Sequence, residues 1–174
     1  MHKNKKIILL GIMVLAAALV LSGCKSAEEK AAEKLIESGT NGQADVDIGT
    51  NSVKINTNAG SYQAGGNVTL PSGFPDDVYR ISGTLTAAFA TTDTEGYTIS
   101  IETSKSMAEA KNLYDQELVS DGWTVTSSMA LQDTIVVTAT KDNRFVSVTI
   151  STIDSQVTVT ITTYTNTSDD ADQE

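Results

Sequence analysis

Alternation of apolar residues with Thr and Ser is the main pattern of the chain. Six segments show it: residues 79–90, 96–103, 123–128, 134–140, 145–151 and 157–163. A two-residue period is typical of strands that are buried on one face only. Asp142-Asn143 and Asp154-Ser155 separate the last three segments and have the composition of tight turns. We therefore predict six strands, of which the last three are joined by hairpins.

The segment between the second and third of these strands has helical spacing. Ser106 and Glu109 form a capping box, in which each residue satisfies a free backbone amide of the other. The apolar residues that follow lie on one helical face: Met107, Ala110, Leu113, Tyr114 and Leu118. Asp121-Gly122 is typical of a helix end. The pattern predicts a helix from residue 107 to about residue 120 with one buried face.

These elements predict an α+β domain over residues 68–164. Its antiparallel sheet has about six strands in the order β-β-α-β-β-β-β, with the helix packed on the apolar face and the Thr-rich face toward water. Pro71 and Pro75 predict an ordered turn at the entrance to this domain. Residues 165–174 are rich in Asp and are expected to be a disordered acidic tail.

Residues 24–67 have the composition of a stem and a linker. Residues 27–37 form a short charged helix with a thin apolar stripe, as expected for a stem. Half of the glycines of the chain lie in residues 38–67, among Asn, Thr and Ser. Two alternating patches, at Val46-Asp47-Ile48 and Val53-Lys54-Ile55, predict at most a weak hairpin there.

The amino terminus has the layout of an export signal. A cationic start with Lys3, Lys5 and Lys6 precedes an uncharged apolar run from Ile7 to Leu21. A helix of that length reaches about 22 Å, short of the roughly 30 Å of hydrocarbon in a bilayer. We therefore predict a cleaved signal over residues 1–23 rather than a membrane span.

Leu21-Ser22-Gly23-Cys24 follows this run and resembles the lipobox of bacterial lipoproteins. The resemblance implies cleavage between Gly23 and Cys24 and a diacylglycerol anchor on Cys24, with the exported domain facing the periplasm or the cell exterior. Two acyl chains suffice for stable anchoring in the cell membrane or the outer membrane. Lys25 stands where many inner-membrane lipoproteins carry Asp, which favours the outer membrane in a cell that has one. The alternative is an ordinary secretory signal with an unpaired exported thiol.

Composition restricts the chemistry of the mature domain. The chain has 22 acidic and 12 basic residues, for a net charge of −10, so binding to nucleic acid is not expected. His2, inside the signal, is the only histidine, and Cys24 is the only cysteine. His-based triads, Cys nucleophiles and the usual zinc sites need those side chains. We expect no metal, no cofactor and no disulfide.

Paired carboxylates are the main catalytic chemistry that remains. Asp76 with Asp77, or Asp93 with Glu95, has the groups for general acid and base catalysis. Adjacent acids in turns lack the burial that separates their pKa values. We therefore predict a protein that is not an enzyme and keep a carboxylate-based hydrolase as a less favoured alternative.

Five residues are candidates for a binding surface: Phe74, Tyr79, Trp123, Lys141 and Arg144. Trp123 directly follows the predicted helix end, where the alternative role for its ring is to fill the core. Lys141 and Arg144 flank a hairpin turn and have the charge to bind an anion. The alternative is a solvated turn.

The lipobox and three further segments together support a second resemblance to a known group of proteins. The three segments are Glu33-Lys34-Leu35-Ile36-Glu37, Leu70 to Val78, and Asp121-Gly122-Trp123. Together they resemble a group of uncharacterised bacterial envelope lipoproteins. The function we expect is a lipid-anchored interaction or structural module that contacts another envelope protein or a glycan. A small-ligand-binding or inhibitor module using the region of Phe74 and Trp123 is the alternative.

Overall fold

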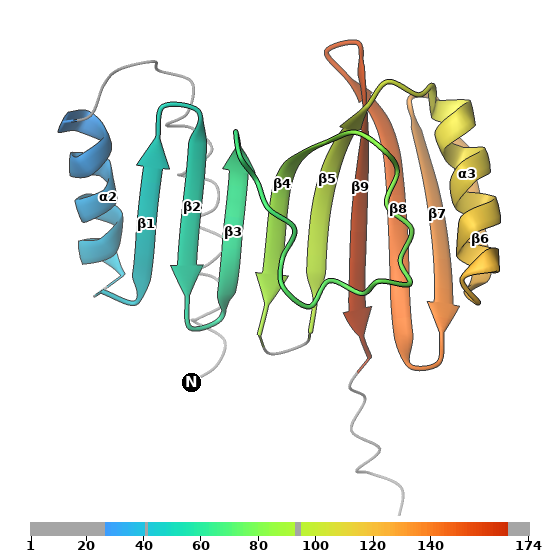
Figure 1. Ribbon diagram of the computed structural model, residues 1–174, viewed down its shortest axis with the longest axis horizontal. Helices are drawn as coiled ribbons and strands as arrows, with labels where there is room; N and C mark the ends of the chain where they lie inside the picture. Colours follow the sequence, from blue (N-terminus) through green and yellow to red (C-terminus); the bar gives the residue numbers. More distant parts are fainter. Residues whose placement is uncertain (1–26, 41, 93–94, 167–174) are drawn as a thin grey trace, which may run out of the picture.

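The computed structural model describes residues 27–40, 42–92 and 95–166, which form two helices and nine strands (Figure 1). In chain order these are α2 (Ala27–Gly39), β1 (Ala44–Gly49), β2 (Ser52–Thr57), β3 (Gly60–Gly65), β4 (Thr84–Thr91), β5 (Tyr97–Thr103), α3 (Met107–Ser120), β6 (Thr124–Leu131), β7 (Thr134–Lys141), β8 (Arg144–Ile153) and β9 (Gln156–Thr165). The strands form one sheet in the order β1-β2-β3-β4-β5-β9-β8-β7-β6, and all neighbours are antiparallel. The predicted signal, Cys24, Asp93 and residues 167–174 lie outside the described residues.

The predicted order β-β-α-β-β-β-β is confirmed by β4 to β9 with α3. The first strand begins at Thr84 instead of residue 79, because residues 79–83 cross the apolar face of the sheet. Ile81 is buried there, and its backbone N–H donates to the Tyr114 hydroxyl at 3.3 Å. A tertiary contact therefore replaces the strand that alternation predicts.

The predicted number of about six strands is wrong, because the sheet has nine. The additional strands β1, β2 and β3 lie in the segment that composition assigned to a linker. They are stabilised by what an isolated hairpin lacks: β3 pairs with β4 in the register Tyr62↔Phe89, and α2 packs on β1. The amino-terminal strands thus extend the sheet of the second half of the chain.

Two glycines of this segment have a structural role in the strands. Gly60 and Gly65 begin and end β3 with φ of +152° and +93°. A Cβ atom on Gly60 would lie 2.0 Å from the carbonyl oxygen of Ala90, and one on Gly65 would lie 2.0 Å from that of Asn51. Both glycines are therefore required by close strand contacts, whereas composition alone suggested flexibility.

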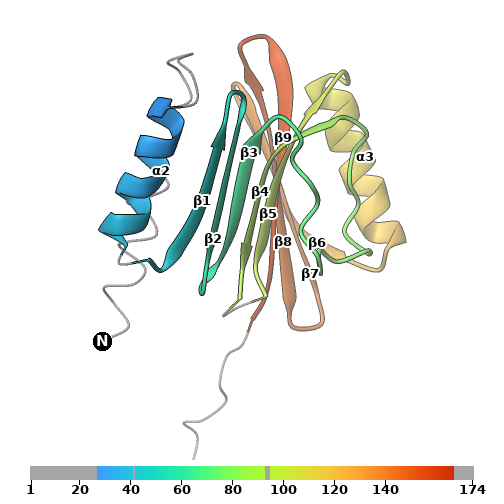
Figure 2. The same cartoon turned by 60° about the vertical axis from the view of Figure 1, so that its left-hand side comes forward.

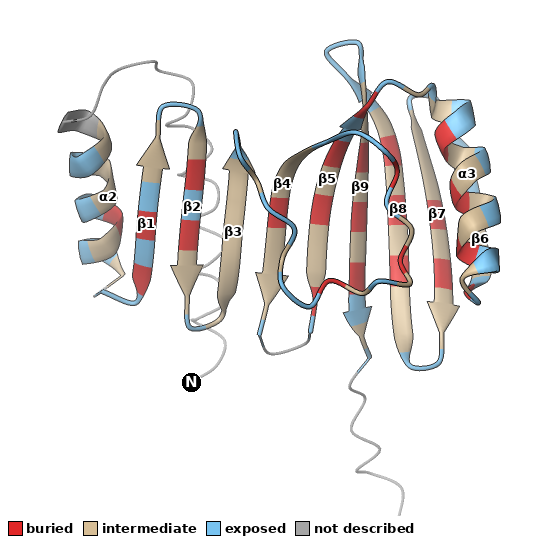
Figure 3. Ribbon diagram, viewed as in Figure 1, coloured by how far each residue is buried: buried red, intermediate tan, exposed pale blue. Residues whose placement is uncertain are grey.

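The main core lies on one face of the sheet, which we call the core face. Figure 3 shows the strands and helices that carry its buried residues. Alternating residues of the central strands supply it, including Ile99, Val148 and Ile161. The helix α3 covers this face with Ala110, Tyr114 and Leu118, and the segment of residues 66–83 adds Phe74, Val78 and Ile81. The prediction of one apolar face covered by a helix is confirmed.

The opposite face of the central strands, which we call the threonine face, carries mainly Thr and Ser. A smaller core lies on this same face at the far end of the sheet, where α2 covers β1 and β2. It consists of Ile36, Ala44, Val46, Val53 and Ile55. The two helices consequently pack on opposite faces at opposite ends of the sheet (Figure 2). No described helix covers the threonine face over β5, β9 and β8.

The ends of α3 follow the predicted signals. Ser106 accepts a hydrogen bond from the Glu109 backbone N–H, and the Glu109 carboxylate accepts one from the Ser106 backbone N–H at 2.9 Å. This capping box lowers the pKa of Glu109. Gly122, with φ of +85°, follows the helix end. Among the described residues, no helix has the length and hydropathy to cross a membrane.

Candidate ligand-binding pocket on the threonine face

Three of the five residues predicted for a binding surface meet around Asp77. The Lys141 ammonium donates to its carboxylate at 2.6 Å, and the Arg144 guanidinium donates to both carboxylate oxygens at 2.8 and 2.6 Å. Trp123 Nε1 donates to the Asp77 backbone carbonyl at 2.7 Å, and the Arg144 guanidinium lies 5.0 Å from the centroid of the Trp123 ring. This group fastens the segment of residues 66–83 to the ends of β7 and β8.

The charges in this cluster compensate one another. Hydrogen bonds from Arg144 and Lys141 hold the pKa of Asp77 far below its usual range, although partial burial acts in the opposite direction. The bond to Asp77 raises the pKa of Arg144. Lys141 also donates to the Asp121 carbonyl at the end of α3. Both cations have an anionic partner within the chain, so binding of an external anion there stays a prediction.

The other two predicted residues belong to this same segment and pack against β5 and α3. The buried Phe74 ring meets Tyr97 edge to face at 5.9 Å between centroids. Tyr79 meets Tyr114 edge to face at 5.3 Å, and burial raises the pKa of its hydroxyl. These contacts use the rings for packing, and a role of Phe74 and Tyr79 in ligand binding also stays a prediction.

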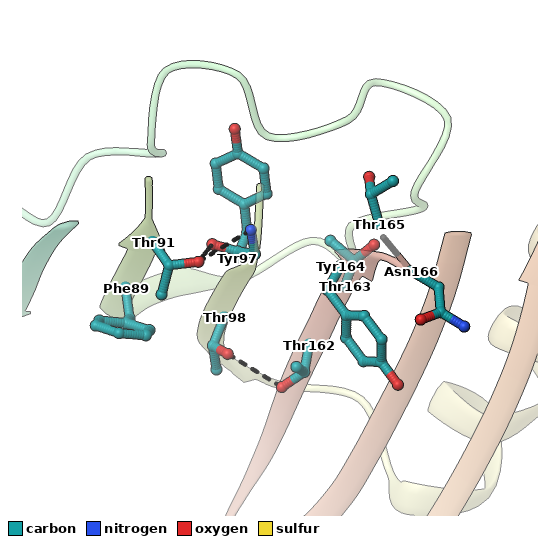
Figure 4. Close-up of a pocket in the computed structure, with 10 residues that line it drawn as sticks. Phe89, Thr91, Tyr97, Thr98, Thr162, Thr163, Tyr164, Thr165 and Asn166 are labelled. Atoms are coloured by element: carbon teal, nitrogen blue, oxygen red, sulfur yellow. Dashed lines mark hydrogen bonds between the residues drawn. The ribbon is translucent and has the colours of Figure 1, made fainter. Parts of the chain in front are cut away.

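A hollow of about 390 Å³ opens on the threonine face, where β4, β5 and β9 lie side by side (Figure 4). Its floor is formed by Thr98 of β5 and Thr162 of β9, whose hydroxyls are 3.1 Å apart. Phe89 of β4 stands on one side of this floor and Tyr164 of β9 on the other. The volume is in the range of small-molecule sites, roughly 300–1,000 Å³.

Strand register brings these side chains together. Phe89 is the cross-strand neighbour of Thr98, and Thr98 is that of Thr162, so all three point to the same face. Tyr164 follows Thr162 by two residues and shares this face. Adjacent strands are about 4.8 Å apart, which places β4 and β9 roughly 10 Å from each other. Because Tyr164 also lies two residues beyond Thr162 along β9, roughly 7 Å further, the two aromatic walls stand diagonally across the floor with their backbones roughly 12 Å apart.

The pocket is held in place by contacts around its rim. The Phe145 ring lies against Tyr164 with centroids 5.1 Å apart. The Thr91 hydroxyl accepts from the Gly96 backbone N–H at 3.1 Å, and the Asn166 backbone N–H donates to the Asn143 carbonyl at 2.7 Å. These bonds restrain both backbone segments that border the hollow.

The lining determines which ligand chemistry the pocket suits. None of its ten residues carries a charge: Phe89, Thr91, Gly96, Tyr97, Thr98, Thr162, Thr163, Tyr164, Thr165 and Asn166. Hydroxyl and amide groups offer both donors and acceptors, and the rings offer apolar faces. The arrangement can hold a neutral, polar ring, and the lining contains no Asp, Glu, His, Lys or Cys.

A second hollow of similar volume lies on the core face, beside the Ser72 loop. Asn56, Ser61, Glu95 and Tyr97 are among its lining residues, and the Tyr97 ring, which packs on Phe74, is its one aromatic ring, compared with Phe89 and Tyr164 on the threonine face. Its neighbourhood is less suited to a ring-shaped ligand. The described residues contain no group of three or more His, Cys, Asp or Glu side chains placed to hold a metal ion.

The pocket residues were not among those predicted from sequence. A signal for them does exist, because Phe89 and Tyr164 are large aromatic residues at positions that alternation assigns to the polar face. The predicted strand of residues 157–163 stopped one residue before Tyr164. The register that joins β4 to β9 across β5 is not visible in the sequence.

A comparison with protein-family models gives one match. A family described as START domain-like matches residues 84–173, just over half of the chain. The match includes both aromatic walls and the floor of the pocket, and it begins after α2, β1, β2 and β3. No curated protein and no solved structure matches the chain.

Proposed function

Because the chain belongs to the START domain-like family, we propose that its function is the non-enzymatic binding of a ligand. Domains of this family are typically non-enzymatic, and the family suggests a ligand-binding module. The uncharged lining of the threonine-face pocket supports the same function, since it offers recognition groups without acid or base. The hydrolase alternative has no comparable support from this pocket.

The ligand class that fits this pocket is a neutral saccharide. A pyranose ring presents C–H faces, which pack against aromatic rings such as Phe89 and Tyr164. Its hydroxyls both donate and accept hydrogen bonds, as do the Thr98 and Thr162 hydroxyls on the floor. The net charge of −10 disfavours acidic glycans. The observation that carries this proposal is the pair of bonded hydroxyls between two aromatic walls.

Location at the envelope is the second part of the proposal. Its support is the lipobox at Leu21 to Cys24, which implies a diacylglycerol anchor. An anchored module with a saccharide pocket would contact envelope glycan, one of the two partner classes expected from sequence. A protein partner remains the other.

Binding to arrayed neutral oligosaccharides of hexoses and N-acetylhexosamines tests the ligand class. We expect Tyr164→Ala to weaken binding at least 10-fold, because the sugar loses one of its two stacking faces. Thr160→Ala is the matched control, since Thr160 lies on the same face of β9 outside the pocket lining. Equal binding by the wild type and Tyr164→Ala, or no binding by the wild type at millimolar saccharide, would contradict the proposal.

A further inference from the structure

The two edges of the sheet differ in how they are protected. At the β1 edge, Glu33 of α2 accepts a hydrogen bond from the Ile48 backbone N–H at 2.9 Å. Asp45 and Asp47 are exposed on the same strand. Side-chain capping, charge and a covering helix are devices that prevent further strand pairing. The β1 edge is therefore closed to another strand.

The β6 edge has no charge or proline over Thr124–Leu131. The strand pairs with β7 alone, so its outer N–H and C=O groups have no strand partner among the described residues. A bulge between Val125 and Ser127 twists the first half, whereas Ser128 to Leu131 pair with β7 in regular register. All four of these last residues are exposed. Such an edge is a template for one more antiparallel strand.

Two large apolar side chains stand at this open edge. Met129 is 54% and Leu131 is 64% exposed. They lie two residues apart and point to the threonine face, on the same side as Val136, the cross-strand neighbour of Met129. An added strand that buries them must itself present apolar groups on this face.

We propose that β6 pairs with β6 of a second copy of this chain, about a two-fold axis at Ala130. In this antiparallel register Ala130 lies opposite Ala130 of the second copy, and Met129 lies opposite Leu131 of the second copy. The apolar pair is formed twice, once on each side of the axis, and all four side chains share one face. The edge is thus complementary to itself.

The distribution of charge and the symmetry of the assembly both favour pairing of β6 with β6 over pairing of β6 with β1 of another copy. Pairing β6 with β1 of another copy would place an uncharged strand against Asp45 and Asp47 and would displace the Glu33 cap. That arrangement would also leave free edges and build an open filament, whereas the two-fold arrangement closes after two copies. Since each copy is strongly acidic, an uncharged edge is where two copies approach with least repulsion.

A cysteine placed on the axis tests the register in the full-length chain. Opposed residues of antiparallel strands have Cα atoms about 4.5–5.5 Å apart, within the span of a disulfide. Ala130→Cys should therefore give a dimer band on mild oxidation as the major species. Ser128→Cys is the same-strand control, because its equivalent in the second copy would lie roughly 13 Å away. Asn58→Cys, in the exposed turn between β2 and β3, is the control for random collision.

A second measurement does not depend on disulfide formation. Light scattering of the purified full-length protein in detergent should give twice the mass of one chain, and Ala130→Lys should halve it by placing two like charges together. Unchanged wild-type circular dichroism in the variant shows that it is folded. A wild type of single-chain mass, crosslinking of Ala130→Cys no greater than that of either control, or crosslinking to a different protein would overturn the proposal.

Discussion

The side chain and backbone of Asp77 connect three parts of the chain. Asp77 joins β7, β8 and the segment of residues 66–83 by accepting from Lys141 and Arg144, while its own carbonyl accepts from Trp123. Hydrogen bonds to charged groups contribute about 1.5–3 kcal/mol to stability, more than neutral ones. The residue is two-thirds buried at its side chain, so these bonds are only partly screened by solvent.

Asp77→Asn should lower the free energy of unfolding by about 1–3 kcal/mol at pH 7. The Asn amide is uncharged and has one acceptor oxygen, so it cannot accept the hydrogen bonds of both Lys141 and Arg144. The folded-state pKa of Asp77 is depressed, so its stabilisation is fully present above the ordinary Asp pKa of about 3.9 and is lost as the pH falls below it. Urea midpoints at pH 7, 5 and 3 check this. The difference from wild type should persist from pH 7 to 5 and shrink at pH 3.

The neighbouring carboxylate provides the control for that titration. Asp76 is exposed, and Asp76→Asn should leave the free energy of unfolding within about 0.5 kcal/mol of wild type at each pH. If Asp77→Asn shows the same difference at all three pH values, the ionised carboxylate is not the source of the effect.

Cys24 is the second residue whose chemistry can be tested alone. Cys24→Ala should abolish labelling by a radioactive fatty acid and move the protein out of the membrane fraction or leave an uncleaved precursor, because Cys24 is the only cysteine that could carry the proposed diacylglycerol. Labelling followed by fractionation and gel electrophoresis measures both effects. An unlabelled wild type with unchanged membrane partition would refute the lipid anchor.

At the scale of elements, α3 is the main cover of the core face. Leu118 of this helix is fully buried, whereas the adjacent Val119 is 59% exposed. Leu118→Ala should cost about 2–5 kcal/mol of unfolding free energy, as truncation of buried Leu does. Val119→Ala and Thr160→Ala should each change it far less. Denaturant titrations decide, and equal small effects for all three would mean that α3 does not cover the sheet.

The strand β3 offers a sharper contrast between neighbours. A Cβ atom on Gly65 would lie 2.0 Å from the Asn51 carbonyl oxygen at a φ of +93°, whereas one on Gly66 would lie 3.6 Å from the same atom, an ordinary contact. Gly65→Ala should therefore disrupt the β2–β3 pairing, and Gly66→Ala should not. Faster proteolysis or hydrogen exchange over β1 to β3 in the first variant alone is the expected result. Unchanged protection in both would favour the linker interpretation.

The elements that sequence predicts well are those with local signals. The capping box at Ser106 and Glu109 and the apolar spacing along α3 identify that helix without tertiary information. The alternation of β7, β8 and β9 likewise needs only neighbouring residues. For β1 to β3, the stabilising strand β4 lies after a turn and a loop, and Gly60 and Gly65 have the same appearance in a linker as in a crowded strand end.

The candidate pocket depends on the whole molecule for a related reason. Phe89 and Tyr164 are far apart in the sequence and come to line one pocket only through the registers of two strand pairs. Residue type alone favours Phe74 and Trp123 as binding residues, and the structure places both rings in the main core. Residue type indicates what a side chain can do, whereas register decides which side chains it meets.

The position of the two helices has a consequence for cooperativity. The small core uses α2, β1 and β2, whereas the main core uses α3 and strands from β4 to β9, so the two cores are joined mainly by the backbone pairing of β3 with β4. The unit from α2 to β3 can therefore open as a separate foldon while β4 to β9 stay folded. In that partly open form β4 becomes the edge strand, and Phe89 loses its neighbour Tyr62. The stability of the pocket wall formed by Phe89 then depends on the unit from α2 to β3, which lies outside the residues that the family model matches.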